Sequence, residues 1–394
     1  MSEAIVRIAA RGDGVTANGR HVPFAAPGDV LLDDGTVEPG PGRQSPPCRH
    51  FPTCGGCQLQ HLTDTAYAEY CTSRVAGALA QHGLEADIRA PHLSPPNTRR
   101  RASLRALKAG GGVLIGFNEA GSNRIIDMVE CHVLHPRLLA LLQPLRRLLT
   151  TILPQKRTAE VQLTFADQGP DVALKGVEVI GLEAVETLTA FSESNRLARL
   201  SIDEGYGPEP RYEPQPVTVT LGGTAVPLPI GSFLQATEDG EAALVGVVRE
   251  ATAGSSRIAD LFAGLGTFAL SLDGQITAAE ASRDAVLSLK SAAARSGRAL
   301  SAEHRDLYRR PYDSNELAAF DAVVLDPPRA GAHEQVRQLA ASSVAKIAYV
   351  SCNPATFARD AEILVKGGYK LDWVQPVGQF RWSTHVELAA AFGR

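Results

Sequence analysis

A cysteine at the end of an apolar run is the residue of this sequence best suited to covalent chemistry. Cys352 follows the apolar run 345–350 and precedes an Asn-Pro pair, a pattern typical of a buried strand that ends in a turn. A thiolate at such a position can attack an electrophilic carbon. The sequence therefore predicts Cys352 to be a catalytic nucleophile.

Two acidic residues also lie at predicted strand ends. Asp326 follows the apolar run 322–325 and is followed by two prolines and Arg329, whereas Glu387 lies at the expected edge of a later strand. A proline pair often makes a plain turn, but an acid at a strand end of an α/β sheet favours a functional role. Because ligands bind beyond the carboxyl ends of such strands, we expect both carboxylates to share a cleft with Cys352.

A glycine-rich turn indicates a nucleotide-type site. The strand-like run 257–262 leads into Gly264 and Gly266, which would let a ligand approach the backbone, and Glu280 at the end of the next run could bind a ribose diol. The turn also satisfies the dinucleotide pattern G-x-G-x-x-G/A, so a nicotinamide dehydrogenase is a competing hypothesis. Against it, no hydride-relay motif follows, and Asp260 before the glycines suits a ligand with a positively charged amino-acid end.

Three cysteines in one short loop, with a fourth further along the chain, have the spacing of metal ligands. Two glycines would let the loop fold tightly around a metal, and the strand-like run 125–130 could return the fourth cysteine to it. Structural zinc sites usually supply two close pairs of ligands and this loop supplies one, whereas an iron–sulfur cluster accepts irregular spacing, so both remain open. The predicted ligands are Cys48, Cys54, Cys57 and Cys131.

Composition indicates an ordinary folded chain. Its 394 residues, 44% apolar and 21% charged, can form two or three domains. We see no signal peptide and no membrane-spanning run, and therefore expect a cytoplasmic protein without a membrane partner. Cys71 lies at helical spacing with apolar residues and is expected in the core. A net charge of −4 and a pI near 6.2 argue against nonspecific polyanion binding, so nucleic acid must bind a local patch.

Strand-like and helical runs alternate from residue 256 onward, which is the pattern of a parallel α/β sheet. The predicted strands are 257–262, 276–279, 322–325 and 346–350. We therefore expect a doubly wound C-terminal domain that binds its ligands at the carboxyl ends of the strands.

Taken together, these segments resemble the RNA uracil-5-methyltransferases, and in particular the iron–sulfur branch that modifies 23S ribosomal RNA. The resemblance covers the chain from about residue 45 to the C-terminus. The matching segments are Cys48-x5-Cys54-Gly-Gly-Cys57, Arg99-Arg100-Arg101, Cys131, Ser232-Phe233-Leu234-Gln235, the segment 260–268, Asp326-Pro-Pro-Arg-Ala-Gly331, Ser351-Cys352-Asn353-Pro354 and His385-Val386-Glu387.

The resemblance implies an α/β fold with a class I, Rossmann-like methyltransferase domain, a β-rich central domain that binds a cluster, and a short N-terminal β segment. We expect the domains to be residues 1–44, 45–230 and 231–394, the first of them a truncated RNA-binding barrel.

The resemblance also implies S-adenosyl-L-methionine as methyl donor and a [4Fe-4S] cluster on the four cysteines named above. Cys352 would be the nucleophile and Glu387 the base. The expected partner is RNA, specifically 23S ribosomal RNA, and the protein is expected to act as a monomer. The residues implied at the donor site are Gln235, Phe262, Thr267, Glu280, Asp306 and Asp326.

Three alternatives stay open at this point. Within the family, transfer RNA could be the substrate. In another class, a noncatalytic iron–sulfur protein that binds RNA or senses redox state would explain the four cysteines but not Cys352 and Glu387. An amino-group methyltransferase is disfavoured because Arg329, and not an aromatic residue, follows the two prolines.

Contacts to RNA are expected from one cationic run and several aromatic residues. Arg99-Arg100-Arg101, with Arg105 and Lys108, would contact phosphates, although a solvated strand face is the alternative. The target base must be unstacked to enter a pocket. The aromatic residues that could stack on it, or belong to the core, are Phe233, Phe380 and Trp382.

Overall fold

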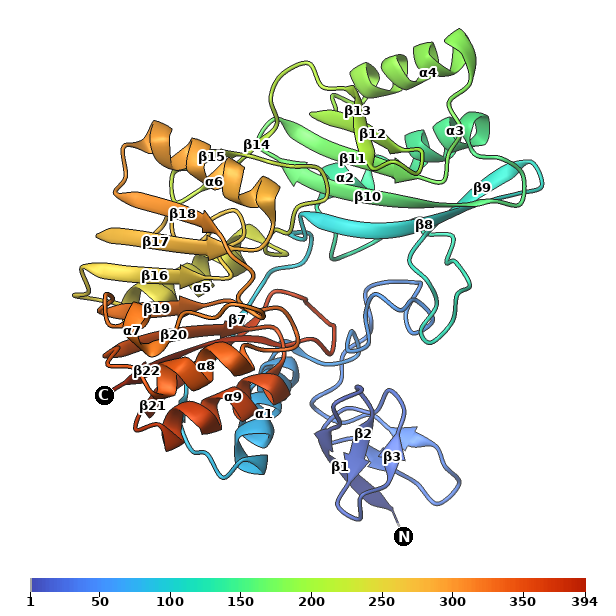
Figure 1. Cartoon of the computed structure of the whole chain (residues 1–394). Coiled ribbons are helices and arrows are strands. Elements are labelled where there is room, and N and C mark those ends of the chain that lie inside the picture. Colours follow the sequence, from blue (N-terminus) through green and yellow to red (C-terminus); the bar gives the residue numbers. More distant parts are fainter. Residues whose placement is uncertain (1) are drawn as a thin grey trace. The chain divides into compact units, whose positions relative to one another are not determined.

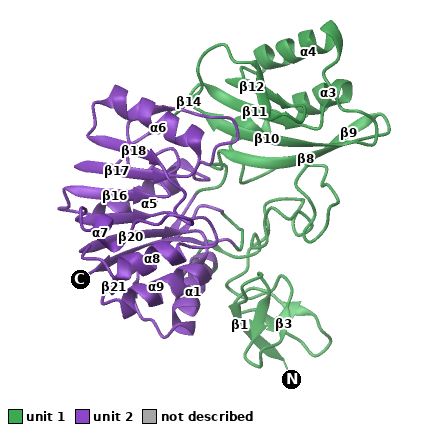
Figure 2. Cartoon of the chain, viewed as in Figure 1, with its two compact units in different colours: residues 1–66, 95–219, 381–384 green, residues 67–94, 220–380, 385–394 purple. Residues whose placement is uncertain are grey.

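The computed structural model describes residues 2–394, which form two compact units (Figure 2). Unit 1 comprises Met1–Ala66, Pro95–Val219 and Arg381–Thr384, and unit 2 comprises Tyr67–Ser94, Thr220–Phe380 and His385–Arg394. Neither unit is continuous in sequence, because the chain passes between them several times. The division into three domains at residues 44 and 230 stays a prediction.

The N-terminal part of unit 1 is a five-stranded antiparallel sheet with the order β3-β2-β1-β4-β5 (Figure 1). Its small core contains Ile5, Val22, Ala25 and Leu31. This confirms the expected N-terminal β segment. The strands are β1 (Glu3–Ile8), β2 (Gly14–Thr16), β3 (His21–Val22), β4 (Val30–Leu31) and β5 (Val37–Glu38).

The larger sheet of unit 1 has the order β13-β12-β11-β10-β8-β9. Alternate residues Ala102, Leu104 and Ala106 of β8 are buried, which is the period-two pattern of a strand with one face in the core. The strands are β8 (Arg101–Ala109), β9 (Gly112–Gly116), β10 (Thr158–Ala166), β11 (Gly169–Lys175), β12 (Arg199–Asp203) and β13 (Pro208–Tyr212), and the helices are α2 (Pro136–Leu139), α3 (Leu142–Ile152) and α4 (Gly181–Ser194).

The run 125–130, which was predicted to be a strand, is not one. A single isolated bridge involves Ile125, and the chain beyond it is irregular. It passes very close to β9, because a Cβ on Gly116 would lie 2.2 Å from the carbonyl oxygen of Ile126. This close, uneven approach replaces a regular ladder, yet it still returns Cys131 to the neighbourhood of the N-terminal cysteines.

Unit 2 contains a nine-stranded sheet in which β18-β17-β16-β19-β20-β22-β21-β6 are neighbours and β7 also pairs with β21. The five strands from β18 to β20 are parallel, and β22 is antiparallel to both of its neighbours. The strands are β6 (Asp87–Ile88), β7 (His92–Leu93), β16 (Arg257–Leu261), β17 (Gln275–Glu280), β18 (Leu300–His304), β19 (Ala322–Leu325), β20 (Lys346–Ser351), β21 (Lys370–Gly378) and β22 (Glu387–Gly393).

Helices and a short hairpin complete the fold. Helix α5 packs against β20 and β22, and α9 packs against β21. The helices are α1 (Asp64–Gln81), α5 (Glu238–Ala251), α6 (Arg283–Ser296), α7 (Ser314–Leu317), α8 (His333–Ala340) and α9 (Pro354–Lys366), and the hairpin is formed by β14 (Thr218–Leu221) and β15 (Thr224–Pro227).

The topology confirms the predicted doubly wound α/β fold. All four strands predicted from the alternating pattern are present, and Cys71 of α1 is fully buried as expected. The strand order reverses at β16, which has β17 on one side and β19 on the other, and such switch points are where ligands bind in this class of fold. Among residues 2–394, the longest and most apolar helices fall short of what a membrane crossing requires.

Candidate active site

A cavity of about 580 Å³ lies in unit 2 at the carboxyl ends of the parallel strands. Volumes of this size are typical of small-molecule sites. The cavity is lined by residues that end or follow each of the parallel strands β16, β17, β18, β19 and β20, by part of the segment 231–235 and by the first residue of β22. It brings together all eight residues predicted for catalysis and donor binding, namely Gln235, Phe262, Thr267, Glu280, Asp306, Asp326, Cys352 and Glu387.

The glycine-rich turn after β16 forms one wall of this cavity. Phe262 has a left-handed backbone with φ of 64°, a strained conformation for an aromatic residue. The N–H of Gly264 donates to Glu280 Oε2 at 2.9 Å, which ties the turn to the end of β17. Gly266 packs tightly, since a Cβ there would lie 2.4 Å from Leu289 Cδ1. The turn therefore presents backbone to the cavity in a fixed shape.

Asp260 does not line the cavity, so the prediction that it meets a positively charged ligand is wrong. The residue is fully buried, and its Oδ2 accepts the N–H of Ala269 at 2.8 Å. Burial raises the pKa of Asp260 to about 8. The hydrogen bond from Ala269 opposes this shift, and the charges of Asp326 and Glu280 add smaller increases. Asp260 holds the glycine-rich turn in place from inside the fold.

Cys352 and Asp326 lie at the ends of adjacent strands and share an acidic environment. Burial, followed by the charges of Glu387 and Asp326, raises the pKa of the Cys352 thiol to about 11, although Arg329 acts in the opposite direction. Burial and then the charge of Glu280 raise the pKa of Asp326 to about 7. The thiol is therefore mostly protonated at neutral pH, and a nearby positive charge would favour its reactive form.

Gln379 is a functional candidate that sequence reasoning missed. Its Nε2 donates to Gln235 Oε1 at 2.7 Å and also to Glu387 Oε2. Its Oε1 accepts the backbone N–H of Ala236 at 2.7 Å. Motif spacing could not find it, because a lone glutamine carries no chemistry of its own. The sequence feature that could have indicated Gln379 is its position directly before Phe380, close to the predicted base Glu387.

The three aromatic residues considered for base stacking have different surroundings. Phe233 lines the cavity and has 58% of its surface exposed. Trp382 belongs to unit 1, is 4% exposed and packs with Cys57. The ring of Phe380 makes an edge contact with that of His385, with centroids 6.1 Å apart. Phe233 is therefore the one of the three in position to meet a base at the cavity, and Trp382 is a core residue.

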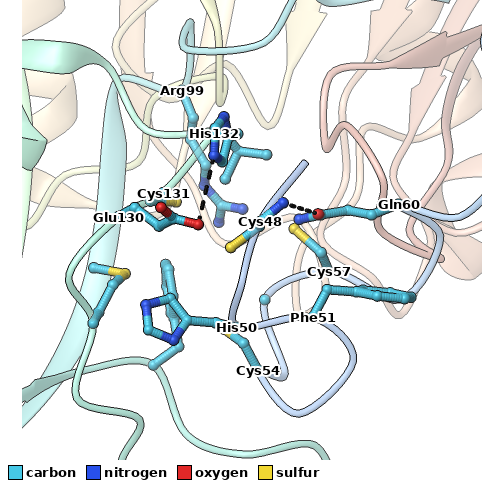
Figure 3. A pocket seen from close by; sticks show the side chains of 14 residues that line it. Cys48, His50, Phe51, Cys54, Cys57, Gln60, Arg99, Glu130, Cys131 and His132 are labelled. Atoms are coloured by element: carbon cyan, nitrogen blue, oxygen red, sulfur yellow. Dashed lines mark hydrogen bonds and ion pairs between the residues drawn. The ribbon is translucent and has the colours of Figure 1, made fainter. Parts of the chain in front are cut away.

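The four predicted metal ligands lie in unit 1 around one small cavity (Figure 3). Burial raises the pKa of Cys57 to about 12 against an opposing hydrogen bond from Gln60, and it also raises the pKa values of Cys54 and Cys131. Within residues 2–394, groups of three or more His, Cys, Asp or Glu side chains arranged to hold a metal ion are absent. The thiols are gathered, but not in the geometry of a single-ion site.

The expected cationic patch is not a single surface. Arg99 lines the cysteine cavity, and Arg100 is buried with 3% of its surface exposed. Arg105 forms an ion pair with Glu160 of the neighbouring strand, with Nη1 and Oε1 2.8 Å apart. Consecutive residues of an extended chain point to opposite sides, so a run of three arginines cannot present one face. The burial of Arg100 contradicts a single exposed run of arginines, whereas contact of the other cationic residues with phosphate stays a prediction.

Comparison with known proteins places this chain among RNA methyltransferases. A family model described as tRNA (Uracil-5-)-methyltransferase matches residues 292–392. An uncharacterized RNA methyltransferase of Zymomonas mobilis is 50% identical over 391 residues, which is 98% of each chain. The 23S rRNA (uracil(1939)-C(5))-methyltransferase RlmD of Chromohalobacter salexigens is 35% identical over 363 residues, covering 88% of this chain and 76% of that protein.

A solved structure has the same fold along the whole chain. The crystal structure of Pyrococcus abyssi tRNA (uracil-54, C5)-methyltransferase in complex with S-adenosyl-L-homocysteine matches with a TM-score of 0.75 at 24% identity, covering 100% of both chains. The predicted class I methyltransferase fold is confirmed by this match. With relatives this similar over most of their length, the chain belongs to the family of RNA uracil-5-methyltransferases.

Proposed function

We propose that this enzyme transfers a methyl group from S-adenosyl-L-methionine to carbon 5 of a uridine in 23S ribosomal RNA. The observation that carries the proposal is the convergence of Cys352, Asp326 and Glu387 with the glycine-rich turn on one cavity. Support for the RNA comes from the relative named as a 23S rRNA (uracil(1939)-C(5))-methyltransferase, which matches 88% of this chain.

S-adenosyl-L-methionine would supply an electrophilic methyl group, and the residues around the glycine-rich turn would hold it. Glu280 ends β17 at the cavity, where a carboxylate suits the two hydroxyls of a ribose. Asp306 and Asp326 add further negative charge to the lining, which favours a ligand with a positive sulfonium and amino group. The Pyrococcus abyssi relative contains S-adenosyl-L-homocysteine, the compound left after such a transfer.

The side chains of this enzyme supply the steps that the uracil ring needs. Carbon 5 is a weak nucleophile, and Cys352 would activate it by adding as a thiolate to carbon 6. The new sulfur–carbon bond pushes electron density onto carbon 5, which can then accept the methyl group. Glu387 would take the proton left on carbon 5. The electron pair of that C–H bond re-forms the ring double bond, and the Cys352 thiolate leaves.

Electrostatics support an order of binding. The thiol of Cys352 has its pKa raised to about 11 by burial and by Glu387 and Asp326, so thiolate is scarce in the free enzyme. A cationic donor in the same cavity would offset the two carboxylates and lower the pKa of the thiol. Cys352 would therefore become an effective nucleophile once the donor is bound.

A [4Fe-4S] cluster on Cys48, Cys54, Cys57 and Cys131 is the second part of the proposal. The donor set fits such a group, because four thiols line one cavity with irregular sequence spacing. The buried Nε1 of Trp382, which packs beside Cys57, finds no hydrogen-bond partner among residues 2–394 and could donate to a cluster sulfur. The methyl transfer needs no oxidant or reductant, so the cluster would serve to stabilise this part of unit 1.

The target uridine must leave its base stack to reach Cys352. Phe233 is the aromatic residue suited to receive it, because its exposed ring lines the cavity. Stacking of a base on such a ring contributes about 1 to 3 kcal/mol in single-stranded complexes.

A transfer RNA substrate is the second candidate, because the family model that matches residues 292–392 is described as a tRNA (Uracil-5-)-methyltransferase. Mapping 5-methyluridine in ribosomal and transfer RNA, from cells with and without the gene, separates the two. Loss of one modified uridine from 23S ribosomal RNA is expected. Loss confined to transfer RNA would show that transfer RNA is the substrate. Unchanged modification of both RNAs would contradict the proposed activity.

A further inference from the structure

The buried glutamine between β21 and β22 joins two residues of the cavity. Gln379 is 1% exposed, and its Nε2 contacts the side-chain oxygens of Gln235 and Glu387. Its Oε1 accepts the backbone N–H groups of Ala236 at 2.7 Å and Thr237 at 3.3 Å, immediately before α5. All four contacts lie within unit 2.

These contacts fix which end of the amide faces which partner. Backbone N–H groups can only donate, so the Gln379 oxygen must face them and its NH₂ group must face the other two side chains. The Gln235 oxygen then faces Gln379, which turns the Gln235 NH₂ group toward Asp326 Oδ2 at 3.4 Å. The backbone N–H groups before α5 thereby set which group donates and which accepts in each hydrogen bond of the series from Asp326 to Glu387.

Close packing also fixes the position of the Gln379 side chain. Gly240 in the first turn of α5 leaves room for it, because a Cβ at that position would lie 2.7 Å from Gln379 Cβ. A donor held this firmly restricts the carboxylate it contacts, and hydrogen bonds to ionised carboxylates are stronger than those between neutral groups. Glu387 is itself buried, so bulk water would not take the place of a lost Gln379 donor.

We propose that Gln379 is a positioning residue, which orients the Glu387 carboxylate to remove the proton from carbon 5 and turns the Gln235 amide toward Asp326. This inference builds on the proposed function, in which Glu387 is the base and Cys352 the nucleophile. Gln379 touches neither substrate nor donor in this account, and it acts through Glu387.

The Gln379→Glu variant separates positioning from folding. It keeps an oxygen for the N–H groups of Ala236 and Thr237, but it replaces the donor toward Glu387 and Gln235 by an acceptor. A Gln379→Met variant removes the donor without adding charge. Gln335→Glu is the matched control, since Gln335 is equally buried, exchanges two hydrogen bonds with the backbone of Tyr312 and lies outside the cavity lining.

The experiment compares two RNA substrates. RNA with 5-fluorouridine forms the covalent adduct but cannot lose fluorine to a base, so it counts the enzyme molecules that can add and methylate. Per competent molecule, both Gln379 variants should turn over ordinary uridine RNA about 10-fold to 100-fold more slowly and accumulate covalent adduct on it. The Gln335 control should lose both activities by the same factor, if it loses either.

Two results would overturn the inference. One is turnover per competent molecule within about twofold of the wild type in both Gln379 variants. The other is loss of adduct formation and turnover in equal proportion, which would make Gln379 a support of the fold alone. If the wild type itself forms no adduct with 5-fluorouridine RNA, then the proposed function fails, and that outcome is distinct from both.

Discussion

Ser351 on β20 pairs with Leu388 on β22 across an antiparallel ladder. Cys352 directly follows the first residue of this pair, and Glu387 directly precedes the second. In antiparallel strands, the residue after one partner lies opposite the residue before the other. The proposed nucleophile and the proposed base therefore sit side by side at the end of a rigid sheet, which suits two groups that act on adjacent ring carbons.

Replacing Glu387 by glutamine should stall the enzyme after methyl transfer. The variant keeps the size of the side chain but cannot accept a proton, so turnover should fall about 10²-fold to 10⁴-fold. Methylated RNA should stay attached to Cys352, and denaturing gels with labelled RNA would detect it. Glu362→Gln on α9, where Glu362 pairs with Lys366, is the control and should leave turnover unchanged. Full turnover in the Glu387 variant would remove it as the base.

The same carboxylate should control the reactivity of Cys352 in the free enzyme. Burial and then the charge of Glu387 raise the pKa of the thiol to about 11, so removing that charge should lower the pKa and raise the thiolate fraction. At about pH 8, alkylation of Cys352 should be faster in Glu387→Gln than in the wild type. Mass spectrometry of the Cys352 peptide would measure it. An equal or slower rate would show that the thiol does not sense Glu387.

The cysteine cavity should bind iron and sulfide. Protein purified without oxygen should contain about four iron and four sulfide per chain, and Cys57→Ser should lose most of both. Cys71→Ser is the matched control, since Cys71 is also buried but lies in α1, outside the cavity. Chemical analysis of iron, sulfide and zinc decides the matter. Zinc in place of iron, retained by the Cys71 variant and lost by the Cys57 variant, would establish a zinc site.

The N-terminal sheet should depend on the pair formed by Asp29 and Arg43. Asp29 is fully buried, and it accepts hydrogen bonds from Arg43 and from the backbone N–H groups of Ala26 and Gly40. Asp29→Asn should destabilise this part of unit 1 by about 2 to 4 kcal/mol, because the cation loses its partner. Hydrogen exchange of residues 2–44 would report it.

The pH dependence of this contribution has a definite sign. Burial works to raise the pKa of Asp29, but its hydrogen bonds and Arg43 hold it below the ordinary 3.8. A carboxyl whose pKa is depressed in the folded state stabilises the fold at pH values above its unfolded-state pKa. It loses that effect as the pH falls through its folded-state pKa. The difference between wild type and variant should therefore be full at neutral pH and shrink in strong acid. A difference that stays constant into strong acid would refute the role of the charge.

Local pattern was enough to predict the doubly wound sheet and the convergence of the site. Cys352 and Asp326 follow from one rule, that ligands bind beyond the carboxyl ends of strands. Glu387 instead begins β22, which runs antiparallel to β20 and so brings its amino end to the same edge of the sheet. The same rule failed for Asp260, because a residue inside a strand end can point into the core, and one-dimensional pattern does not fix that direction.

Tertiary contacts decided the features that sequence could not predict. Residues 125–130 do not form the expected strand, because the carbonyl group of Ile126 approaches Gly116 too closely for a regular ladder. The three consecutive arginines do not share one surface, because neighbouring elements bury Arg100. Gln379 gains its importance from hydrogen bonds to Gln235 and Glu387. Both partners were predicted site residues, but no sequence pattern shows that Gln379 joins them.

The transient bond between Cys352 and the uracil ring can be trapped with 5-fluorouridine RNA. Wild-type enzyme with S-adenosyl-L-methionine should form an adduct that survives denaturation, and mass spectrometry should place the RNA on the Cys352 peptide. Cys352→Ala should form none, whereas the buried Cys71→Ala control should form it normally. An adduct on another residue, or methylation of uridine RNA by Cys352→Ala at the wild-type rate, would contradict the account.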